Sequence, residues 1–410
     1  MSSYLINLHE AIYSLSDALD LVGVTHIHHG KRVAFMAAEC GKRLGWDQKQ
    51  LDELFQAAIL HDSGVSKTTV HTKLAQLQWE EEGEHCRLGA ELMRSSPLLA
   101  HFAPIILHHH THWSQLELLE LPEAVKLNAN CIYMVDRVDI LTLKHLAEGA
   151  DILLGKEKIR DTIASKRGDW FHPELVDAFL DISRSEAFWF SLEMDNINGY
   201  VSTWVTETRP ESMSFESLRS LVYVFSRIVD AKSVFTREHS EGVARLARYL
   251  GERAGLSRES CEMIELAGLL HDIGKLRIPD ELLEKPGKLD DKEVILMRRH
   301  SFDTYNILKK ISGLEQVTQW AAQHHERVDG SGYPYHLGKD ALAIEARIIE
   351  VADVFQALAQ RRPYRDSLPP ETILAMLQEQ VASGKLDGDV VALVAGDLHR
   401  CWEMAMRGGD

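Results

Sequence analysis

The sequence has few of the features that mark secreted, membrane-spanning or disulfide-bonded proteins. Its five cysteines are scattered without a C-x-x-C spacing, which is typical of unpaired thiols in a reducing cytosol. No run approaches the ~20 apolar residues that a membrane span requires. The first ten residues carry neither a basic segment nor the long apolar core of a signal peptide. We therefore expect a cytoplasmic protein with no contact with the membrane.

An excess of positive charge is also absent, and this excludes one class of partner. The chain has 45 Lys and Arg against 62 Asp and Glu, a formal net charge of −17. A chain of this charge repels a polyanion, so we expect no nucleic-acid polymer as its partner. A small dianionic ligand is not excluded, because metal ions and a few basic groups would set the field around it.

Strand-like alternation of apolar and polar residues is scarce, whereas helical spacing recurs along the chain. Apolar residues stand at roughly helical spacing in segments 33–44, 51–60, 88–93 and 127–143. The pattern predicts an all-α protein. Segment 207–214 mixes Pro, Ser and charge, as linkers do, and Ser214 can cap a new helix. We therefore predict two domains, 1–208 and 214–410.

The second half of the chain carries metal donors at widely separated positions. Residues 324–334 read His-His-Glu-Arg-Val-Asp-Gly-Ser-Gly-Tyr-Pro after an apolar helical stretch. Adjacent helical residues point ~100° apart, so a His-His pair suits two nearby ions better than one. The candidate donors are His239, His271, Asp272, His300, His324, His325 and Asp353. Imidazoles and carboxylates without a thiolate favour two divalent ions of Fe, Mn or Ni over a structural zinc.

These motifs resemble those of HD-GYP domains, the bacterial cyclic-dinucleotide phosphodiesterase branch of the HD superfamily. The resemblance covers about residues 220–410 and rests on His-Asp-Ile-Gly-Lys, His-His-Glu-x-x-Asp-Gly-x-Gly-Tyr-Pro and Arg-Pro-Tyr-Arg. It implies hydrolysis of cyclic di-GMP or 3′,3′-cyclic GMP-AMP to a linear 5′-phosphorylated dinucleotide. It also implies that Lys275, Arg362 and Arg365 contact phosphate.

Phosphodiester hydrolysis needs an activated water and help for the leaving oxygen. We expect Asp272 to bridge the two ions, which would share and activate a water. Lys275 would contact a phosphate oxygen or assist the leaving group. Tyr333 either covers the base of its loop or shapes the substrate pocket, and Glu326 is a candidate carboxylate partner for a ligating histidine.

Two positions depart from the family pattern. Some relatives hold a third metal with a glutamate four residues before the first histidine, where this chain has Phe235. The departure favours two ions. The family often shows an aspartate three residues after the last donor, where this chain has Gln356.

The first half of the chain repeats the donor pattern of the second. Ile-Leu-His-Asp-Ser-Gly at 59–64 echoes Leu-Leu-His-Asp-Ile-Gly at 269–274, and the preceding histidines keep one interval, since 61 − 29 and 271 − 239 both equal 32. The equivalent donors are predicted to be His29, His61, Asp62, His85, His108, His109 and Asp136. The sequence thus predicts tandem HD-type helical domains, the first of them divergent.

The function of the first domain stays open between two hypotheses. It has Val65 where the second domain has Lys275, and it has no Gly-Tyr-Pro loop. Retention of seven donors in apolar helices favours bound metal, because unpaired buried Asp and His are costly. The domain is then either a 5′-nucleotidase acting on the linear product or a regulatory module.

For the whole chain, two alternatives to a phosphodiesterase remain at this stage. One is a non-catalytic cyclic-dinucleotide receptor, which intact donors and Lys275 argue against. The other is an HD nucleotidase acting on mononucleotides, which would not need the Gly-Tyr-Pro loop. A homodimer is compatible with the sequence, which does not fix the oligomeric state.

Overall fold

The computed structural model describes residues 3–22, 28–65, 83–147, 152–206, 208–232, 238–360 and 366–406. Helices dominate these residues, and their only sheet has two short strands, so the predicted all-α class is confirmed. The chain separates into two compact units. The N-terminal unit is Leu8–Arg209, and the C-terminal unit combines Met1–Asn7 with Pro210–Asp410. The predicted domain limits, 1–208 and 214–410, stay a prediction.

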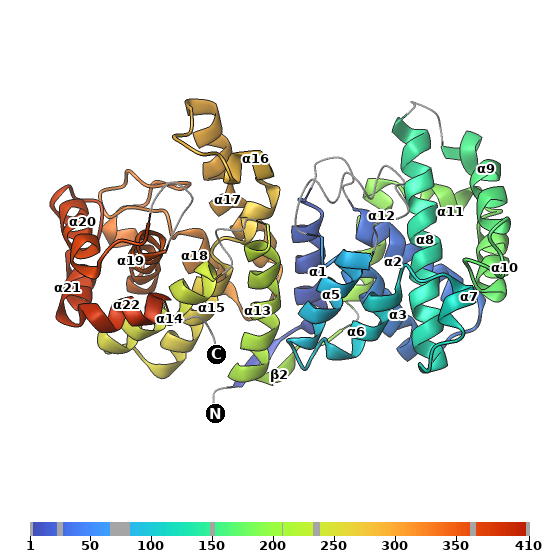
Figure 1. Ribbon diagram of the computed structural model, residues 1–410, viewed down its shortest axis with the longest axis horizontal. Helices are drawn as coiled ribbons and strands as arrows, with labels where there is room; N and C mark the ends of the chain where they lie inside the picture. Colours follow the sequence, from blue (N-terminus) through green and yellow to red (C-terminus); the bar gives the residue numbers. More distant parts are fainter. Residues whose placement is uncertain are drawn as a thin grey trace. The chain divides into compact units, whose positions relative to one another are not determined.

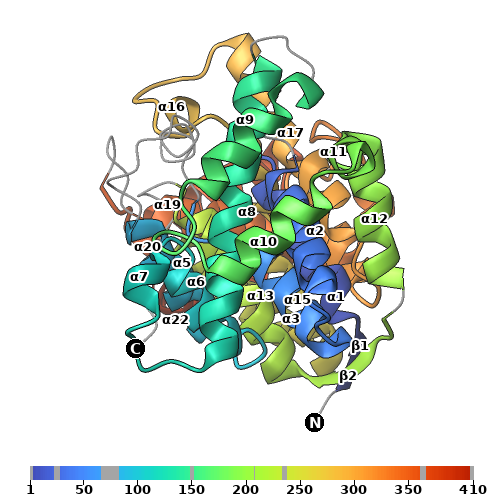
Figure 2. The same cartoon turned by 90° about the vertical axis from the view of Figure 1, so that its right-hand side faces the viewer.

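The N-terminal unit is built from helices that pack mainly on α2, α3 and α8 (Figure 1). Its elements are α1 (Leu8–Leu19), α2 (His29–Arg43), α3 (Gln48–Leu60), α5 (Gly83–Arg94), η1 (Ala100–Phe102), α6 (Ala103–His108), α7 (Trp113–Leu116), α8 (Glu123–Ala147), α9 (Ile152–Ala164), α10 (Pro173–Ile182), α11 (Glu186–Phe190) and α12 (Met194–Thr206). Helix α9 packs on both α8 and α10 (Figure 2). A capping box of Asp47 and Gln50 starts α3.

The C-terminal unit centres on α14, which packs on α15, α19 and α22. Its elements are β1 (Ser3–Ile6), β2 (Glu211–Ser214), α13 (Phe215–Asp230), α14 (His239–Arg253), α15 (Arg258–Leu270), η2 (Ile273–Arg277), α16 (Asp280–Leu283), α17 (Asp291–Leu308), α18 (Glu315–Ala322), η3 (Lys339–Ala341), α19 (Ile344–Ala359), α20 (Pro370–Ala382), α21 (Gly388–Gly396) and α22 (Leu398–Met406). Ser214 caps α13, as predicted, by accepting the backbone N–H of Ser217.

The first residues of the chain belong to the C-terminal unit. Strand β1 pairs antiparallel with β2, in a register that places Ser3 opposite Ser214 and Ile6 opposite Glu211. The hydroxyl of Tyr4 donates a hydrogen bond of 2.7 Å to the buried carboxylate of Glu262. This pairing ties the start of the chain to a segment more than 200 residues away.

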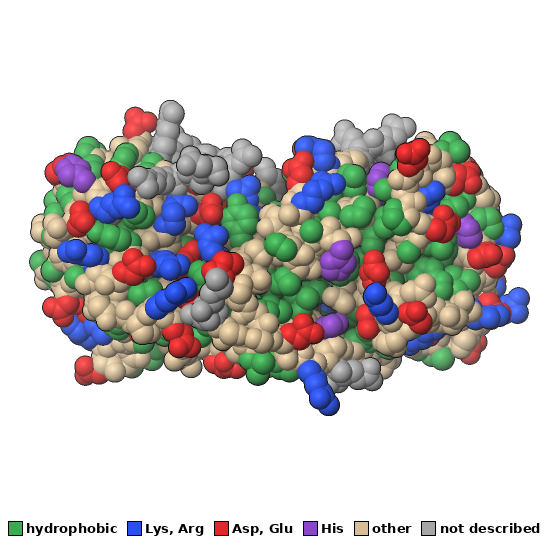
Figure 3. All heavy atoms as spheres, turned by 90° about the horizontal axis from the view of Figure 1, so that it is seen from below, with side chains coloured by type: hydrophobic (Ala, Val, Ile, Leu, Met, Phe, Trp, Pro, Cys, Tyr) green, Lys and Arg blue, Asp and Glu red, His purple; other side chains and the backbone are tan. Residues whose placement is uncertain are grey.

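The surface and the thiols show few specialised features. On the face drawn in Figure 3, basic and acidic side chains are interspersed among the described residues. All five cysteines are buried and none forms a disulfide. Within the described ranges, we find no helix with the length and hydropathy of a bilayer-spanning segment.

Candidate metal centres

The structure brings together all seven predicted donors of the C-terminal unit. They come from the first residue of α14 (His239), the turn after α15 (His271 and Asp272), α17 (His300), the turn after α18 (His324 and His325) and α19 (Asp353). Six of them form two groups of three, His239 with His271 and Asp353, and His300 with His324 and His325. Two groups of this kind fit two ions.

The carboxylate of Asp272 lies between the two groups. Its Oδ2 is 3.6 Å from Nε2 of His239 and 3.3 Å from Nε2 of His271. Its Oδ1 is 3.6 Å from Nε2 of His300 and 3.7 Å from Nε2 of His324. This Oδ1 is buried and has no hydrogen-bond partner among the described residues, a state that calls for a ligand. One oxygen thus faces each group, as a bridging carboxylate requires.

Backbone carbonyls orient three of the imidazoles. In each, Nδ1 lies within hydrogen-bond distance of the carbonyl three residues earlier: His271 with Gly268 at 2.7 Å, His300 with Met297 at 2.6 Å, and His324 with Ala321 at 2.7 Å. In a neutral ring, an N–H at Nδ1 that donates to this carbonyl leaves Nε2 unprotonated. The lone pairs of all three rings then point into the centre.

Burial sets the protonation of several donors. It lowers the pKa of His300 to about 4 and that of His325 to about 3, so both rings are neutral near pH 7. Burial acts to raise the pKa of Asp353, but the hydrogen bond and charge of His239 hold it well below its ordinary value. Neutral imidazoles and ionised carboxylates are the forms that bind metal.

The predicted phosphate contact and loop tyrosine lie beside the donors. The ammonium of Lys275 is 2.5 Å from Oδ2 of Asp272. The ring of Tyr333 lies 4.9 Å from that of His325, and burial raises the pKa of its phenol well above the ordinary value. The guanidinium of Arg298 stacks over Tyr333 at 5.1 Å, a neighbouring cation that sequence reasoning missed.

Glu326 organises the Gly-Tyr-Pro loop. Among the described residues, its hydrogen-bond partners do not include a ligating histidine ring. Its buried carboxylate accepts the backbone N–H groups of Tyr335 at 2.6 Å and Leu337 at 2.9 Å. The interpretation of Glu326 as a histidine partner is therefore replaced by a loop-anchoring role. The predicted phosphate contacts Arg362 and Arg365 lie outside the described residues.

The N-terminal unit repeats this arrangement around Asp62. Its Oδ2 lies 3.6 Å from Nε2 of both His29 and His61. Its Oδ1 lies 3.7 Å from Nε2 of His85 and 4.0 Å from Nε2 of His109. A carboxylate again stands with one oxygen toward each of two histidine groups.

The structure shifts the register of the predicted histidine pair by one residue. His109 takes the place of His324, because its Nε2 lies 3.4 Å from Nε2 of His85 and its Nδ1 lies 2.6 Å from the carbonyl of Ile106, three residues earlier. His110, which was not predicted, approaches Asp136 as His325 approaches Asp353, each at 4.0 Å. His108 is not brought into the centre, and its ring lies 3.4 Å from the hydroxyl of Thr111.

A signal for the correct register was present in the sequence. The intervals 109 − 85 and 324 − 300 both equal 24. The prediction instead relied on the interval from the second histidine of the pair to the last aspartate, which is 27 residues from His109 and 28 from His325. The run of three histidines, 108–110, allowed either pair to be chosen.

In the N-terminal unit, the buried carboxylate of Asp139 orients the ring of His29. The C-terminal unit has the side-chain amide of Gln356 in this place. Asp139 lies 2.7 Å from Nδ1 of His29 and accepts two hydrogen bonds from Arg32. Burial lowers the pKa of His29, but its hydrogen bonds with Asp136 and Asp139 outweigh this and raise it to about 10, so a bound ion would displace a proton here.

In the C-terminal unit, Gln356 orients the equivalent histidine, His239. Its Oε1 lies 2.5 Å from Nδ1 of His239 and accepts that N–H. Gln356 and Asp139 each stand three residues after the last donor of their unit, so the common offset could have identified Asp139 from the sequence. The departure at Gln356 keeps the orienting contact and removes the charge.

Comparisons with known proteins agree with the two centres. The HD domain family matches residues 27–141 and again residues 223–390. A 3′3′-cGAMP-specific phosphodiesterase 1 of Vibrio cholerae is 35% identical over 98% of this chain and 94% of its own length. A cyclic di-GMP phosphodiesterase response regulator of Xanthomonas campestris is 39% identical over 40% of this chain and 44% of its own.

A solved structure is similar over nearly the whole length of the chain. It is a cyclic GMP-AMP specific phosphodiesterase of V. cholerae, with a TM-score of 0.64 and 25% identity, covering 97% of this chain and 98% of that one.

Proposed function

Because this chain belongs to the HD-GYP family of HD-domain phosphodiesterases, we propose that its C-terminal unit opens a cyclic dinucleotide to a linear 5′-phosphorylated product. The observation that carries this assignment is the place of Asp272, with one carboxylate oxygen toward each donor group. A non-catalytic receptor has no use for a carboxylate placed between two groups of metal donors. A mononucleotidase has no use for the Gly-Tyr-Pro loop beside them.

The residues of the C-terminal unit fit two divalent metal ions. His239, His271 and Asp353 would hold one, His300, His324 and His325 the other, and Asp272 would bridge them. Two bound ions would supply an activated water and neutralise phosphate charge. The donor set lacks a thiolate, which supports Fe, Mn or Ni rather than a structural zinc.

The protein's own groups would position the substrate and stabilise developing charge. Lys275, whose ammonium contacts Asp272, would turn to a phosphate oxygen or to the leaving ribose oxygen. The neutral phenol of Tyr333 can donate a hydrogen bond to the substrate, and Arg298 above its ring adds positive charge. Arg362 and Arg365 are proposed as further phosphate contacts on the family resemblance alone.

We propose 3′,3′-cyclic GMP-AMP as the preferred substrate, ahead of cyclic di-GMP. The support is that a relative named as specific for 3′3′-cGAMP matches nearly the full chain, whereas the cyclic di-GMP enzyme of X. campestris matches two fifths of it. The buried, unbridged thiols support a reducing, cytoplasmic compartment.

The test is chromatography of the products that protein of known metal content forms from three cyclic dinucleotides. We expect a linear 5′-phosphorylated product, formed fastest from 3′,3′-cyclic GMP-AMP. Faster turnover of cyclic di-GMP would overturn the preference, and recovery of all three rings intact would overturn the activity.

For the N-terminal unit, we propose metal binding and removal of the 5′-phosphate from the linear product. The support is the repeated donor geometry around Asp62, combined with Val65 in place of Lys275 and the lack of a Gly-Tyr-Pro motif. A centre that holds metal in a simpler pocket suits a terminal phosphate better than a ring. Regulation without catalysis is the second candidate.

A further inference from the structure

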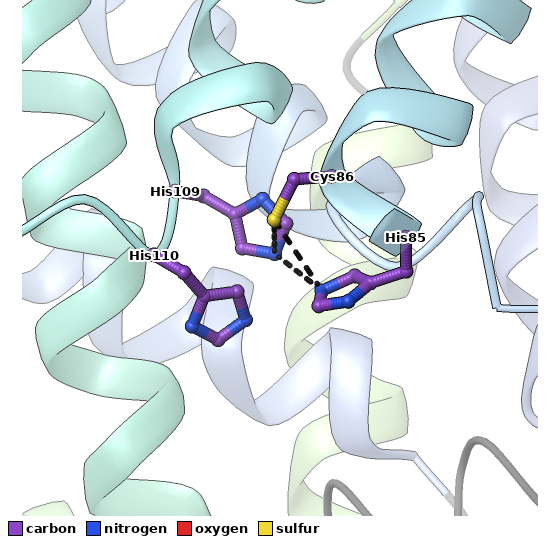
Figure 4. Close-up of side chains that lie close together, drawn as sticks. All are labelled: His85, Cys86, His109 and His110. Carbon is purple, nitrogen blue, oxygen red and sulfur yellow. Dashed lines mark hydrogen bonds between the residues drawn. The ribbon is translucent and has the colours of Figure 1, made fainter. Parts of the chain in front are cut away.

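One group of the N-terminal centre contains a thiol. Figure 4 shows Cys86 beside His85 and His109, with His110 on the other side of the same cluster. The Sγ atom lies 3.6 Å from Nε2 of His85 and 4.0 Å from Nε2 of His109. Each of these four residues offers one ligand atom, and the four atoms all lie within 4.8 Å of one another. Cys86 is buried.

The distances among the ligand atoms of Cys86, His85 and His109 are close to the edges of a zinc tetrahedron. Bonds of about 2.3 Å to sulfur and about 2.05 Å to nitrogen give tetrahedral edges of about 3.5 Å for S···N and about 3.3 Å for N···N. The two observed S···N distances are 3.6 and 4.0 Å. The two imidazole nitrogens of His85 and His109 are 3.4 Å apart. A Zn²⁺ ion would therefore be held with small movements of the side chains.

The C-terminal unit has no thiol at the equivalent position. Ser301 follows His300 as Cys86 follows His85, and its hydroxyl lies 3.4 Å from Nε2 of His300. A neutral hydroxyl is a poor ligand for a transition metal, so the three histidines there leave a coordination position for water or phosphate. In the N-terminal unit a thiolate would fill that position.

The charge of a thiolate would be compensated close by. Arg137 donates a hydrogen bond of 2.6 Å to Oδ2 of Asp136, and the same nitrogen lies 3.3 Å from Nδ1 of His110. The equivalent residue of the C-terminal unit is the uncharged Val354. Arg137 is thus a buried cation within hydrogen-bond distance of one of the four residues, and a buried thiolate needs such a neighbouring positive charge.

We propose that Cys86, His85, His109 and His110 ligate a Zn²⁺ ion in a closed site that the C-terminal unit does not have. Four protein ligands leave no position for water, so this ion stabilises or regulates the unit. Any hydrolysis there falls to the other group, His29, His61 and Asp136 with Asp62. The inference rests on the proposed metal binding of the N-terminal unit and does not depend on its proposed activity.

The test uses the full-length chain with His271→Ala and Asp272→Ala, which disables the C-terminal centre, reconstituted with Co²⁺ as a spectroscopic substitute for zinc. We expect cobalt uptake with a thiolate-to-cobalt charge-transfer band in the near ultraviolet. Adding Cys86→Ser should abolish the band, whereas Cys131→Ala, which removes another buried thiol of the same unit, should leave it unchanged. Far-ultraviolet circular dichroism checks that each variant is folded.

The outcomes separate the inference from the function proposed above. Cobalt uptake without the band, or a band that survives Cys86→Ser, overturns thiolate ligation by Cys86 and is compatible with metal binding by the unit through its other donors. No cobalt uptake overturns both. X-ray absorption of the zinc-loaded wild-type protein needs no variant, and the lack of a sulfur neighbour at about 2.3 Å would also refute the site.

Discussion

Gly274 lies so close to the backbone carbonyl of His300 that no side chain fits between them. A Cβ at this position would collide with that oxygen. The Gly274 N–H also donates a hydrogen bond to the hydroxyl of Thr304, which lies in α17 together with His300. Gly64 stands in the same relation to the carbonyl of His85 in the N-terminal unit. The glycine of each His-Asp-x-Gly motif therefore allows the aspartate of the motif to lie against the helix that carries the next histidine.

This contact predicts that Gly274→Ala damages the C-terminal centre. Separating η2 from α17 would move Asp272 away from His300, and overpacking of this kind costs roughly 1–3 kcal/mol. We expect lower metal content and at least tenfold slower ring opening. The matched control is Gly396→Ala at the end of α21, where the nearest atom to an added Cβ is 3.9 Å away. Wild-type metal content and rate in Gly274→Ala would contradict the packing argument.

A second prediction concerns the bridging ligand. Replacing His271 and Asp272 with alanine removes two ligands from one proposed ion position and one from the other, so the metal content should fall. Ring opening should drop by several orders of magnitude, since metal ions supply most of the barrier reduction. Product chromatography and metal analysis are the measurements, and His61→Ala/Asp62→Ala is the control expected to keep ring opening. Turnover of every substrate at the wild-type rate by the first variant would end the assignment.

A third prediction separates phosphate contact from metal binding. Lys275→Met keeps the length of the side chain and removes its charge, so metal content should hold. Turnover should fall about 10²- to 10³-fold, as for other groups that stabilise developing charge. Lys309→Met, at an exposed position just after α17, is the control. If metal is lost along with activity, Lys275 acts through Asp272 and not on the substrate.

A fourth prediction concerns pH and the stability of the C-terminal unit. Burial raises the pKa of Glu350 to about 8, although Arg327 opposes the shift by binding the carboxylate at 2.9 Å. The folded state therefore keeps the proton to a higher pH than the unfolded state, whose ordinary pKa is about 4.3. Folding stability contributed by this proton is present below pH 4.3 and is lost as pH rises toward 8.

Glu350→Gln removes this titration and keeps an oxygen to accept from Arg327. The melting temperature of the wild type should thus fall relative to that of the variant between pH 5 and 8, measured by calorimetry of metal-free protein. Parallel pH profiles for the two proteins would show that Glu350 does not titrate in this window.

Much of the C-terminal centre could be predicted because its donors stand in motifs whose residue types are unusual for apolar helices. His-Asp after three apolar residues, and His-His before a glycine-rich loop, have few roles apart from metal binding. The residues behind the donors were harder to predict. Arg298 acts through a tertiary contact that no local pattern encodes, and only the offset of three residues from the last donor marks Asp139. Cys86 gave no signal as a lone cysteine until folding placed it beside two imidazoles.

The pairing of β1 with β2 was likewise not predicted. Four residues at the start of the chain carry no pattern that distinguishes them from a loop. Their place in the C-terminal unit means that a fragment ending at residue 208 would lose the partner of its first strand. The N-terminal unit is therefore best tested within the full chain.

The last prediction concerns 5′-phosphate removal by the N-terminal unit. Full-length protein with His271→Ala/Asp272→Ala should no longer open the ring but should still release phosphate from an added linear 5′-phosphorylated dinucleotide. With His61→Ala/Asp62→Ala the ring should open while the linear product accumulates, because the donors around Asp62 are lost. We expect phosphate release to fall at least 10²-fold in this second variant. A linear dinucleotide without the 5′-phosphate is the blank.

The two double variants distinguish three cases: phosphate removal by the C-terminal centre, a purely regulatory N-terminal unit, and phosphate removal by the N-terminal unit. Phosphate release that follows Asp272 and ignores Asp62 would place both steps in the C-terminal centre. No release from either variant or from the wild type, with metal bound around Asp62, would make the unit regulatory. If two centres act in sequence, phosphate release must depend on His61 and Asp62 and must survive the loss of His271 and Asp272. Each His-Asp motif then controls the cleavage of one bond in the same substrate.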